Sequence, residues 1–130
     1  MVNELKYQEG LKVRKKVLGE DYVERAFATA TDFSRPFQDL VTRFAWGEIW
    51  TRPGLDLKTR SLINLAIMTA LNRPNELAIH IRGALRNGVT IEEIREVFLQ
   101  TAVYCGIPAA LDSFKIAQDI FDEEQMSERD

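Results

Sequence analysis

One stretch of the sequence limits the choice of fold more than any other. Residues 62–71 read LINLAIMTAL and are apolar in almost every direction around a helix. A helix that is apolar on all sides belongs at the centre of a protein. Pro53 and Gly54 end the segment before it, and Asp56 is a suitable N-cap. We therefore expect a central helix, with Leu65, Ile67 and Met68 among the most buried residues.

Apolar residues recur at helical spacing through the rest of the chain. The spacing predicts further helices over residues 3–18, 21–30, 36–50, 76–87, 91–105 and 108–122, with Gly10 loosening the first and the residues after 122 frayed. Thr90 and Glu93 form a capping-box pattern. No segment shows the alternation of a strand, and there is no internal repeat. The pattern predicts an all-α protein, a compact bundle of six to seven helices in one domain over residues 1–130.

The helix over residues 36–50 carries two separate apolar sets. The first is expected to face the core, and it consists of Phe37, Leu40, Val41, Phe44 and Ala45. The second is Trp46 and Trp50, one turn apart on another face. Two tryptophans away from the core stripe indicate a second buried surface, either a partner subunit or the wall of a pocket. The alternative is that they cap the core of the chain itself.

Composition narrows the class of protein. The formal net charge of the 130 residues is −3, which gives no indication of a nucleic-acid partner. No apolar run has the length of a membrane span, and the first residues lack the apolar core of a signal peptide. Cys105 is the only cysteine, so no intrachain disulfide can form and a reducing, cytoplasmic location is expected. Its place on an apolar stripe predicts a buried core thiol.

The only histidine, His80, is the leading candidate for chemistry. It lies at the edge of the apolar arc of its helix, and Glu76 lies one turn earlier on the same side. A carboxylate in that position can hold the orientation of an imidazole, whose pKa can lie near neutral. The arc itself consists of Leu77, Ile81, Ala84 and Leu85. The pattern fits an acid–base centre, but it also fits ordinary residues at the edge of a core.

Motifs for common cofactors are absent from the sequence. It has no glycine-rich phosphate loop, no His-Glu-x-x-His and no Cys-x-x-Cys. One histidine and one cysteine cannot make a zinc site without carboxylates or a second subunit. The chemistry must therefore come from His, Glu, Arg and Tyr side chains, and we expect neither a metal nor a cofactor.

Several of these segments resemble one known family. They are residues 44–55 (FAWGEIWTRPGL), residues 59–62 (TRSL), the pattern ELxxHxxxALxxG over residues 76–88, and residues 104–110 (YCGIPAA). They are similar, in this order, to the carboxymuconolactone decarboxylase family, and the similarity runs from about Ser34 to Phe121. The resemblance implies the helical fold of alkylhydroperoxidase-D-like proteins. It also implies a homo-oligomer, with a hexamer as the first expectation.

The resemblance implies an activity as well. The family decarboxylates 4-carboxymuconolactone, a lactone dicarboxylate, in protocatechuate catabolism by the β-ketoadipate route. A peroxidase branch of the superfamily carries Cys-x-x-Cys-x-x-x-His. Here Arg73 and Glu76 stand at the two cysteine positions, so thiol peroxidase activity is not expected. The alternatives are an enzyme of the same fold acting on another lactone or acidic substrate, and a helical oligomer without catalytic activity.

The residues suit distinct tasks in such a decarboxylation. Arg52 and Arg60 would anchor the anionic arm of the substrate. His80, oriented by Glu76, would deliver a proton to carbon, and Tyr104 would donate a hydrogen bond to the developing oxyanion.

Three further residues, all on the helix over residues 36–50, complete the candidate site. Trp46 and Trp50 would form the dry surface from which CO2 departs. Glu48 is a second acid–base candidate, although a surface carboxylate explains it equally well.

Overall fold

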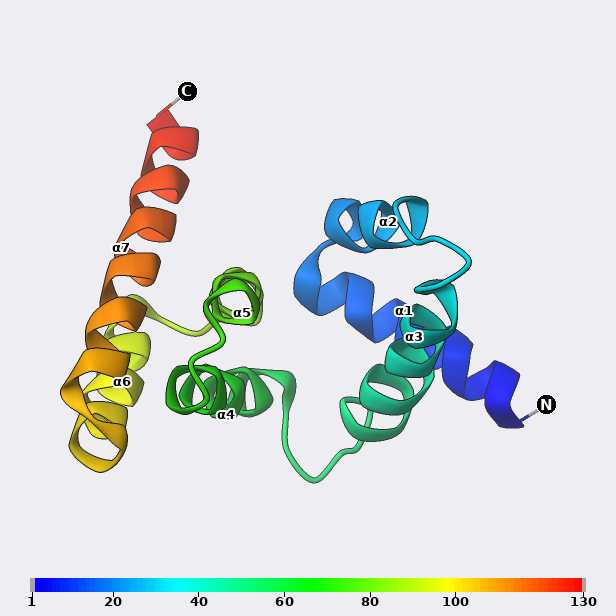
Figure 1. The fold of residues 1–130 in the computed structure, drawn as a ribbon, viewed down its shortest axis with the longest axis horizontal. Helices are drawn as coiled ribbons and strands as arrows, with labels where there is room; N and C mark the ends of the chain where they lie inside the picture. The colour runs from blue at the N-terminus through cyan, green and yellow to red at the C-terminus, as the bar shows by residue number, and fades with distance from the viewer. Residues whose placement is uncertain (1, 130) are drawn as a thin grey trace. The chain divides into compact units, whose positions relative to one another are not determined.

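The computed structural model describes residues 2–129, and the side chains of residues 3–125, as helices joined by short loops (Figure 1). The elements are α1 (Val2–Leu18), α2 (Glu20–Ala28), α3 (Arg35–Val41), the π-helix η1 (Thr42–Ile49), α4 (Leu57–Ala70), α5 (Pro74–Arg86), α6 (Ile91–Cys105) and α7 (Ile107–Arg129). No strand occurs within residues 2–129, so the predicted all-α class is confirmed.

The helices group into two compact units, residues 1–57 and residues 58–130. The expectation of a single domain over residues 1–130 stays a prediction. No helix within residues 2–129 is both long enough and apolar enough to cross a membrane.

In the first unit, α1 packs directly against η1. The contact is close because two glycines lie in it: a methyl group on Gly10 would collide with the carbonyl oxygen of Thr42, and one on Gly47 with the carbonyl oxygen of Lys6. Gly10 therefore does not loosen α1, which is continuous through it. Its role is the close approach of two backbones, which a side chain would prevent.

The helix predicted over residues 36–50 is present, but its buried face is not the predicted one. Phe37, Leu40 and Phe44 are 63%, 49% and 61% exposed, whereas Trp46 and Trp50 are buried. Because α1 packs against the side that carries Thr42 and Gly47, the aromatic stripe points away from it. The prediction that the stripe faces the core of the chain is therefore wrong.

The second unit has a continuous apolar core made by α4 to α7. The predicted arc of α5 is confirmed, because Leu77, Ile81 and Ala84 are all buried. The end of α5 has Gly88 at φ 87°, a left-handed conformation that favours glycine. The start of α6 has the predicted capping box: the Thr90 hydroxyl accepts from the Glu93 amide at 3.0 Å, and the Thr90 amide donates to the Glu93 carboxylate at 2.9 Å.

The expected central helix, α4, is buried on one side only. Ser61, Leu65 and Thr69 form the buried stripe and Met68 is partly buried, but Ile67 is 41% exposed. The prediction is correct for Leu65 and wrong for Ile67, because the side of α4 that carries Ile63 and Ile67 is left uncovered within the chain.

The last two helices also depart from the sequence pattern. Cys105 is exposed at the end of α6 and not buried as predicted. The helix α7 continues to Arg129, seven residues past the expected end at Asp122, so the backbone is helical where fraying was expected. Leu111, near the start of α7, is largely exposed.

Candidate active site

The helix α5 holds His80 and Glu76 in one place. Pro74 begins the helix, and Leu77 and Ile81 fix its orientation in the core. His80 is 5% exposed, whereas the side chain of Glu76 is 54% exposed. His80 Nε2 lies 3.8 Å from Glu76 Oε2. This distance is longer than a hydrogen bond, so the two groups attract strongly only when the imidazole carries a proton.

Burial changes the protonation of this histidine. It lowers the pKa of His80 from 6.5 to about 4, because the charged form loses its hydration. At neutral pH the imidazole of the free chain is therefore neutral, and the expectation of a pKa near neutral is wrong. A neutral imidazole can donate one hydrogen bond and accept one. To deliver a proton it must first gain one, which a nearby anion would favour.

A partly buried polar contact joins α4 to the end of α5. Asn87 Nδ2 donates a hydrogen bond to Ser61 Oγ at 2.8 Å, and Ser61 is fully buried. Ser61 directly follows Arg60, which is partly buried in the first turns of α4. The contact thus fixes the segment that carries Arg60 against the helix that carries His80. Sequence reasoning did not identify Ser61 and Asn87, although a serine at a buried position of an apolar helix is a usable signal.

Tyr104 lies in a different environment. It is 81% exposed, and with Cys105 it lines a groove between α4 and α6. Neither His80 nor Glu76 is among the residues that line this groove. The role of Tyr104 toward the oxyanion stays a prediction.

The remaining candidates belong to the first unit. Trp46 and Trp50 are buried and stack on one another, with ring centroids 4.6 Å apart and an interplanar angle of 22°. Glu48 and Arg52, on either side of Trp50, are exposed. The structure thus groups the two tryptophans, and separately His80 with Glu76. Among residues 2–129, no group of three His, Cys, Asp or Glu side chains is placed to hold a metal ion.

The comparisons with known proteins place the chain in a family. Residues 35–119 match the carboxymuconolactone decarboxylase family, and the chain belongs to this family.

Two curated relatives resemble the chain over most of its length. One is the 4-carboxymuconolactone decarboxylase of Acinetobacter baylyi, 44% identical over 93% of this chain and 90% of the relative. The other is a nitrosuccinic acid decarboxylase of Metarhizium robertsii, 51% identical over 86% of this chain and 78% of the relative. Both names describe the loss of CO2 from an acid, but the two acids differ.

Proposed function

We propose that this protein is a carboxy-lyase that works without a cofactor and converts 4-carboxymuconolactone to 3-oxoadipate enol-lactone in protocatechuate catabolism. The observation that carries the proposal is the 44% identity to the Acinetobacter baylyi decarboxylase over nearly the whole of both chains. The buried histidine with a carboxylate beside it supplies an acid–base group.

The substrate provides its own electron sink. Its ring carbon carries the departing carboxylate and a carboxymethyl arm, and a ring double bond connects that carbon to the lactone carbonyl. When the carbon–carbon bond breaks, the electron pair moves through the double bond onto the carbonyl oxygen. The resulting dienolate then takes a proton at the ring carbon next to the carbonyl. The enzyme must hold the arm, stabilise the oxyanion and supply that proton.

His80 is the proposed proton donor, and its low pKa defines how it would act. A substrate with two negative charges favours the imidazolium form, so binding would raise the pKa that burial lowers. The proton would thus be taken up with the substrate and passed to the dienolate. Glu76, whose carboxylate lies 3.8 Å from the imidazole, would orient the ring and stabilise its charged form.

The other candidates keep their predicted tasks as proposals. Arg60 and Arg52 would bind the carboxylate of the arm, since a guanidinium fork matches a carboxylate. Tyr104 would donate to the oxyanion, and Trp46 with Trp50 would exclude water from the departing CO2. Glu48 remains the second acid–base candidate.

A second substrate is favoured by the relative with the higher identity. Nitrosuccinate also has a carboxylate and a carboxymethyl arm on one carbon, and its nitro group accepts the electron pair as the lactone carbonyl does. Loss of CO2 gives a nitronate, which a proton on carbon converts to 3-nitropropanoate. The 51% identity to the Metarhizium robertsii enzyme makes nitrosuccinate the alternative acidic substrate.

Direct assay separates these candidates. Purified protein, treated with a chelator and given no cofactor, is incubated with each acid, and CO2 and product are followed by NMR. We expect turnover of 4-carboxymuconolactone with the higher kcat/KM. A higher kcat/KM for nitrosuccinate would reassign the substrate, and no turnover of either acid would favour the non-catalytic alternative.

The proposal also covers the oligomeric state and the location of the protein. We propose a homo-oligomer, with a hexamer as the first expectation from the family resemblance, and a cytoplasmic location. Light scattering tests the first, and cell fractionation tests the second. Exposed apolar residues in both units support self-association.

A further inference from the structure

Two surfaces expose apolar side chains that the rest of their own unit leaves uncovered. The first, here called the aromatic face, lies in the first unit and consists of Phe33, Phe37, Leu40 and Phe44. The second, here called the aliphatic groove, lies between α4 and α6 in the second unit. It is lined by Ile63, Ala66, Ile67, Ala70, Val97 and Tyr104 and has a volume of about 540 Å³.

We propose that the aromatic face of one copy of this chain docks in the aliphatic groove of a second copy. The contact is therefore head-to-tail, with two different surfaces meeting, and it specifies how the homo-oligomer proposed above is built. It does not depend on which acid is the substrate.

The area of the aromatic face favours a protein as the partner. Phe33 is 95% exposed, and Phe37 and Phe44 are each about three-fifths exposed. Because a buried aromatic side chain removes 150–250 Å² from water, the face offers roughly 500 Å². A stable interface buries about 800 Å² on each partner, so the face with its borders approaches what an interface between two copies needs. An apolar patch of this size is often a functional surface.

The two surfaces match in length and chemistry. Phe37 and Phe44 are seven residues apart on one helical rod, and Ile63 and Ala70 are seven residues apart on α4, so both span about 10 Å. The groove lining carries no charged side chain. Phenylalanine rings that follow one face of a helix are the usual occupants of such a groove.

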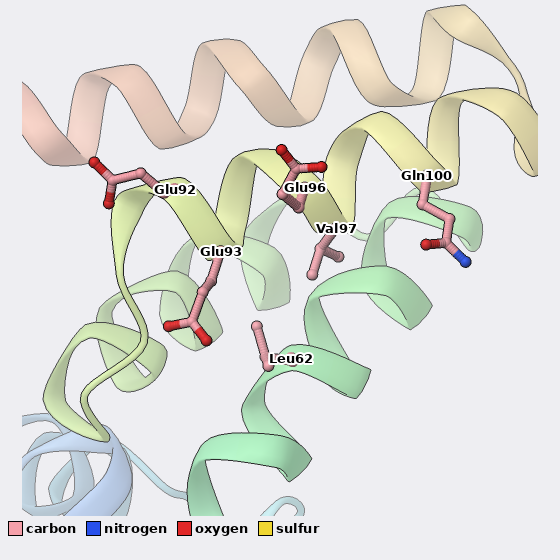
Figure 2. A pocket seen from close by; sticks show the side chains of 6 residues that line it. All are labelled: Leu62, Glu92, Glu93, Glu96, Val97 and Gln100. Carbon is pink, nitrogen blue, oxygen red and sulfur yellow. The ribbon is translucent and has the colours of Figure 1, made fainter.

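Charges at the borders are also complementary. Leu62 and Val97 line both the aliphatic groove and a second hollow toward the start of α6, where Glu92, Glu93 and Glu96 gather. Figure 2 shows Leu62 and Val97 pointing toward one another between α4 and α6. Glu93 already pairs with Lys58 at 3.1 Å. Glu92 and Glu96 are exposed, and they would meet Arg43, which adjoins Phe44 on the other copy.

The test uses one variant of each surface. Phe37→Glu places a charge on the aromatic face, and Ile67→Glu places one in the groove. Leu5→Glu and Leu99→Glu are the matched controls, because both leucines are exposed outside the two surfaces. Molar mass is measured by light scattering over a dilution series. We expect each test variant to weaken association by at least about 30-fold, as for an interface hot spot, and each control to match the wild type.

Mixing the two test variants decides the head-to-tail arrangement. The Phe37→Glu copy keeps its groove and the Ile67→Glu copy keeps its aromatic face, so the mixture should form a one-to-one dimer. If each surface paired with its own kind, each variant alone would still form dimers through its intact surface and mixing would give no dimer of the two variants, and that result would overturn the proposal. A monomeric wild type, or controls that dissociate like the test variants, would also overturn it.

Cys105 gives a readout that needs no surface variant. It is the only thiol, it is exposed in the single chain, and it lines the same groove. Its reaction with a thiol reagent should be slow at high protein concentration and fast on dilution of the wild type. A rate that does not change with concentration would contradict the proposed contact. Decarboxylation is assayed on the same samples, so failure of the interface is distinguished from failure of the proposed activity.

Discussion

In α5, Leu77, Ile81 and Ala84 are buried against helices of their own unit, whereas in α3 and η1 the stripe of Phe37 and Phe44 lies at the surface. Both helices are amphipathic. An apolar stripe shows that a face will be covered, but it does not show whether the same chain or another one covers it. The buried face of α5 is suited to fix a reacting group, and the exposed face of α3 is suited to bind a partner.

The largest expected effect lies on α5. His80→Gln should lower kcat by about 10²–10⁴-fold, the usual contribution of a positioned acid, while Glu76→Gln should lower it less. Steady-state decarboxylation with the preferred acid measures this. Arg82→Gln is the matched control on the same helix, since Arg82 pairs at the surface with Glu123 at 2.8 Å. If His80→Gln keeps near-normal kcat, the histidine is structural, and Glu48 or Tyr104 becomes the leading proton donor.

The comparison between the two stripes can be tested by stability. Ile81→Ala removes a fully buried side chain and should lower the free energy of unfolding by about 2–5 kcal/mol. Phe37→Ala, at an exposed position, should change the stability of the dissociated chain by about 0.5 kcal/mol or less. Urea unfolding at low protein concentration measures both. Equal losses would mean that Phe37 is covered within the chain, and that the two stripes do not differ in this way.

The helices that sequence reasoning placed correctly are those whose caps and stripes act locally. The capping box at Thr90 and the arc of Ile81 depend on neighbours one turn away and on one core, and both were predictable. The packing of α1 against η1 was not, because it depends on the close approach of two backbones at Gly10 and Gly47. The exposure of Ile67 and Cys105 was missed for a related reason: periodicity gives the direction of a side chain but not the neighbour it meets.

The candidate site was predictable in part. His80 and Glu76 are one turn apart on one helix, so their proximity follows from spacing alone. The burial of His80, which lowers its pKa, depends on contacts that the spacing of residues in the sequence does not predict. The contact between Asn87 and Ser61 joins residues 26 positions apart, so only the folded chain reveals it.

The low pKa of His80 leads to a pH dependence of stability. The folded value of about 4 lies below the ordinary 6.5, so the unfolded chain binds the extra proton between these values. Above pH 6.5 the histidine is neutral in both the folded and the unfolded chain, so its burial does not lower the free energy of unfolding. As pH falls from 6.5 toward 4, only the unfolded chain gains the proton, and the free energy of unfolding falls. Between pH 7 and pH 4.5 the wild type should lose on the order of 2–3 kcal/mol more than His80→Gln, measured by urea unfolding.

Direct titration measures the pKa of His80. Because His80 is the only histidine, one set of imidazole NMR signals reports its pKa without assignment. The midpoint should be near 4 in the free protein and higher with a bound dicarboxylate such as succinate. The pH at which kcat falls should likewise lie above the free value, and that limb should vanish in His80→Gln. A midpoint near 6.5 in the free protein would show that His80 is solvated.

One candidate arginine lies in each unit, so substitutions of Arg52 and Arg60 test which unit binds the carboxylates of the substrate. Arg60→Lys keeps the charge but loses the fork, so it should raise KM by about 10-fold, the loss expected for one hydrogen bond to a charged group. Arg52→Lys makes the same change in the first unit. Initial rates over a range of substrate concentration give both values. An unchanged KM in Arg60→Ala and in Arg52→Ala would mean that neither unit holds the dianion through these side chains.

The smallest effect should be that of Cys105→Ala. The thiol is exposed, so the substitution leaves no cavity, and the free energy of unfolding of the dissociated chain should stay within about 0.5 kcal/mol of the wild type. Turnover should also be retained, because a single cysteine without a partner cannot form an intrachain redox couple and the proposed proton step uses an imidazole. Urea unfolding and the decarboxylation assay measure the two quantities on one sample. A folded variant without turnover would show that the end of α6 takes part in the chemistry, and the division between a catalytic α5 and a groove used for association would have to be redrawn.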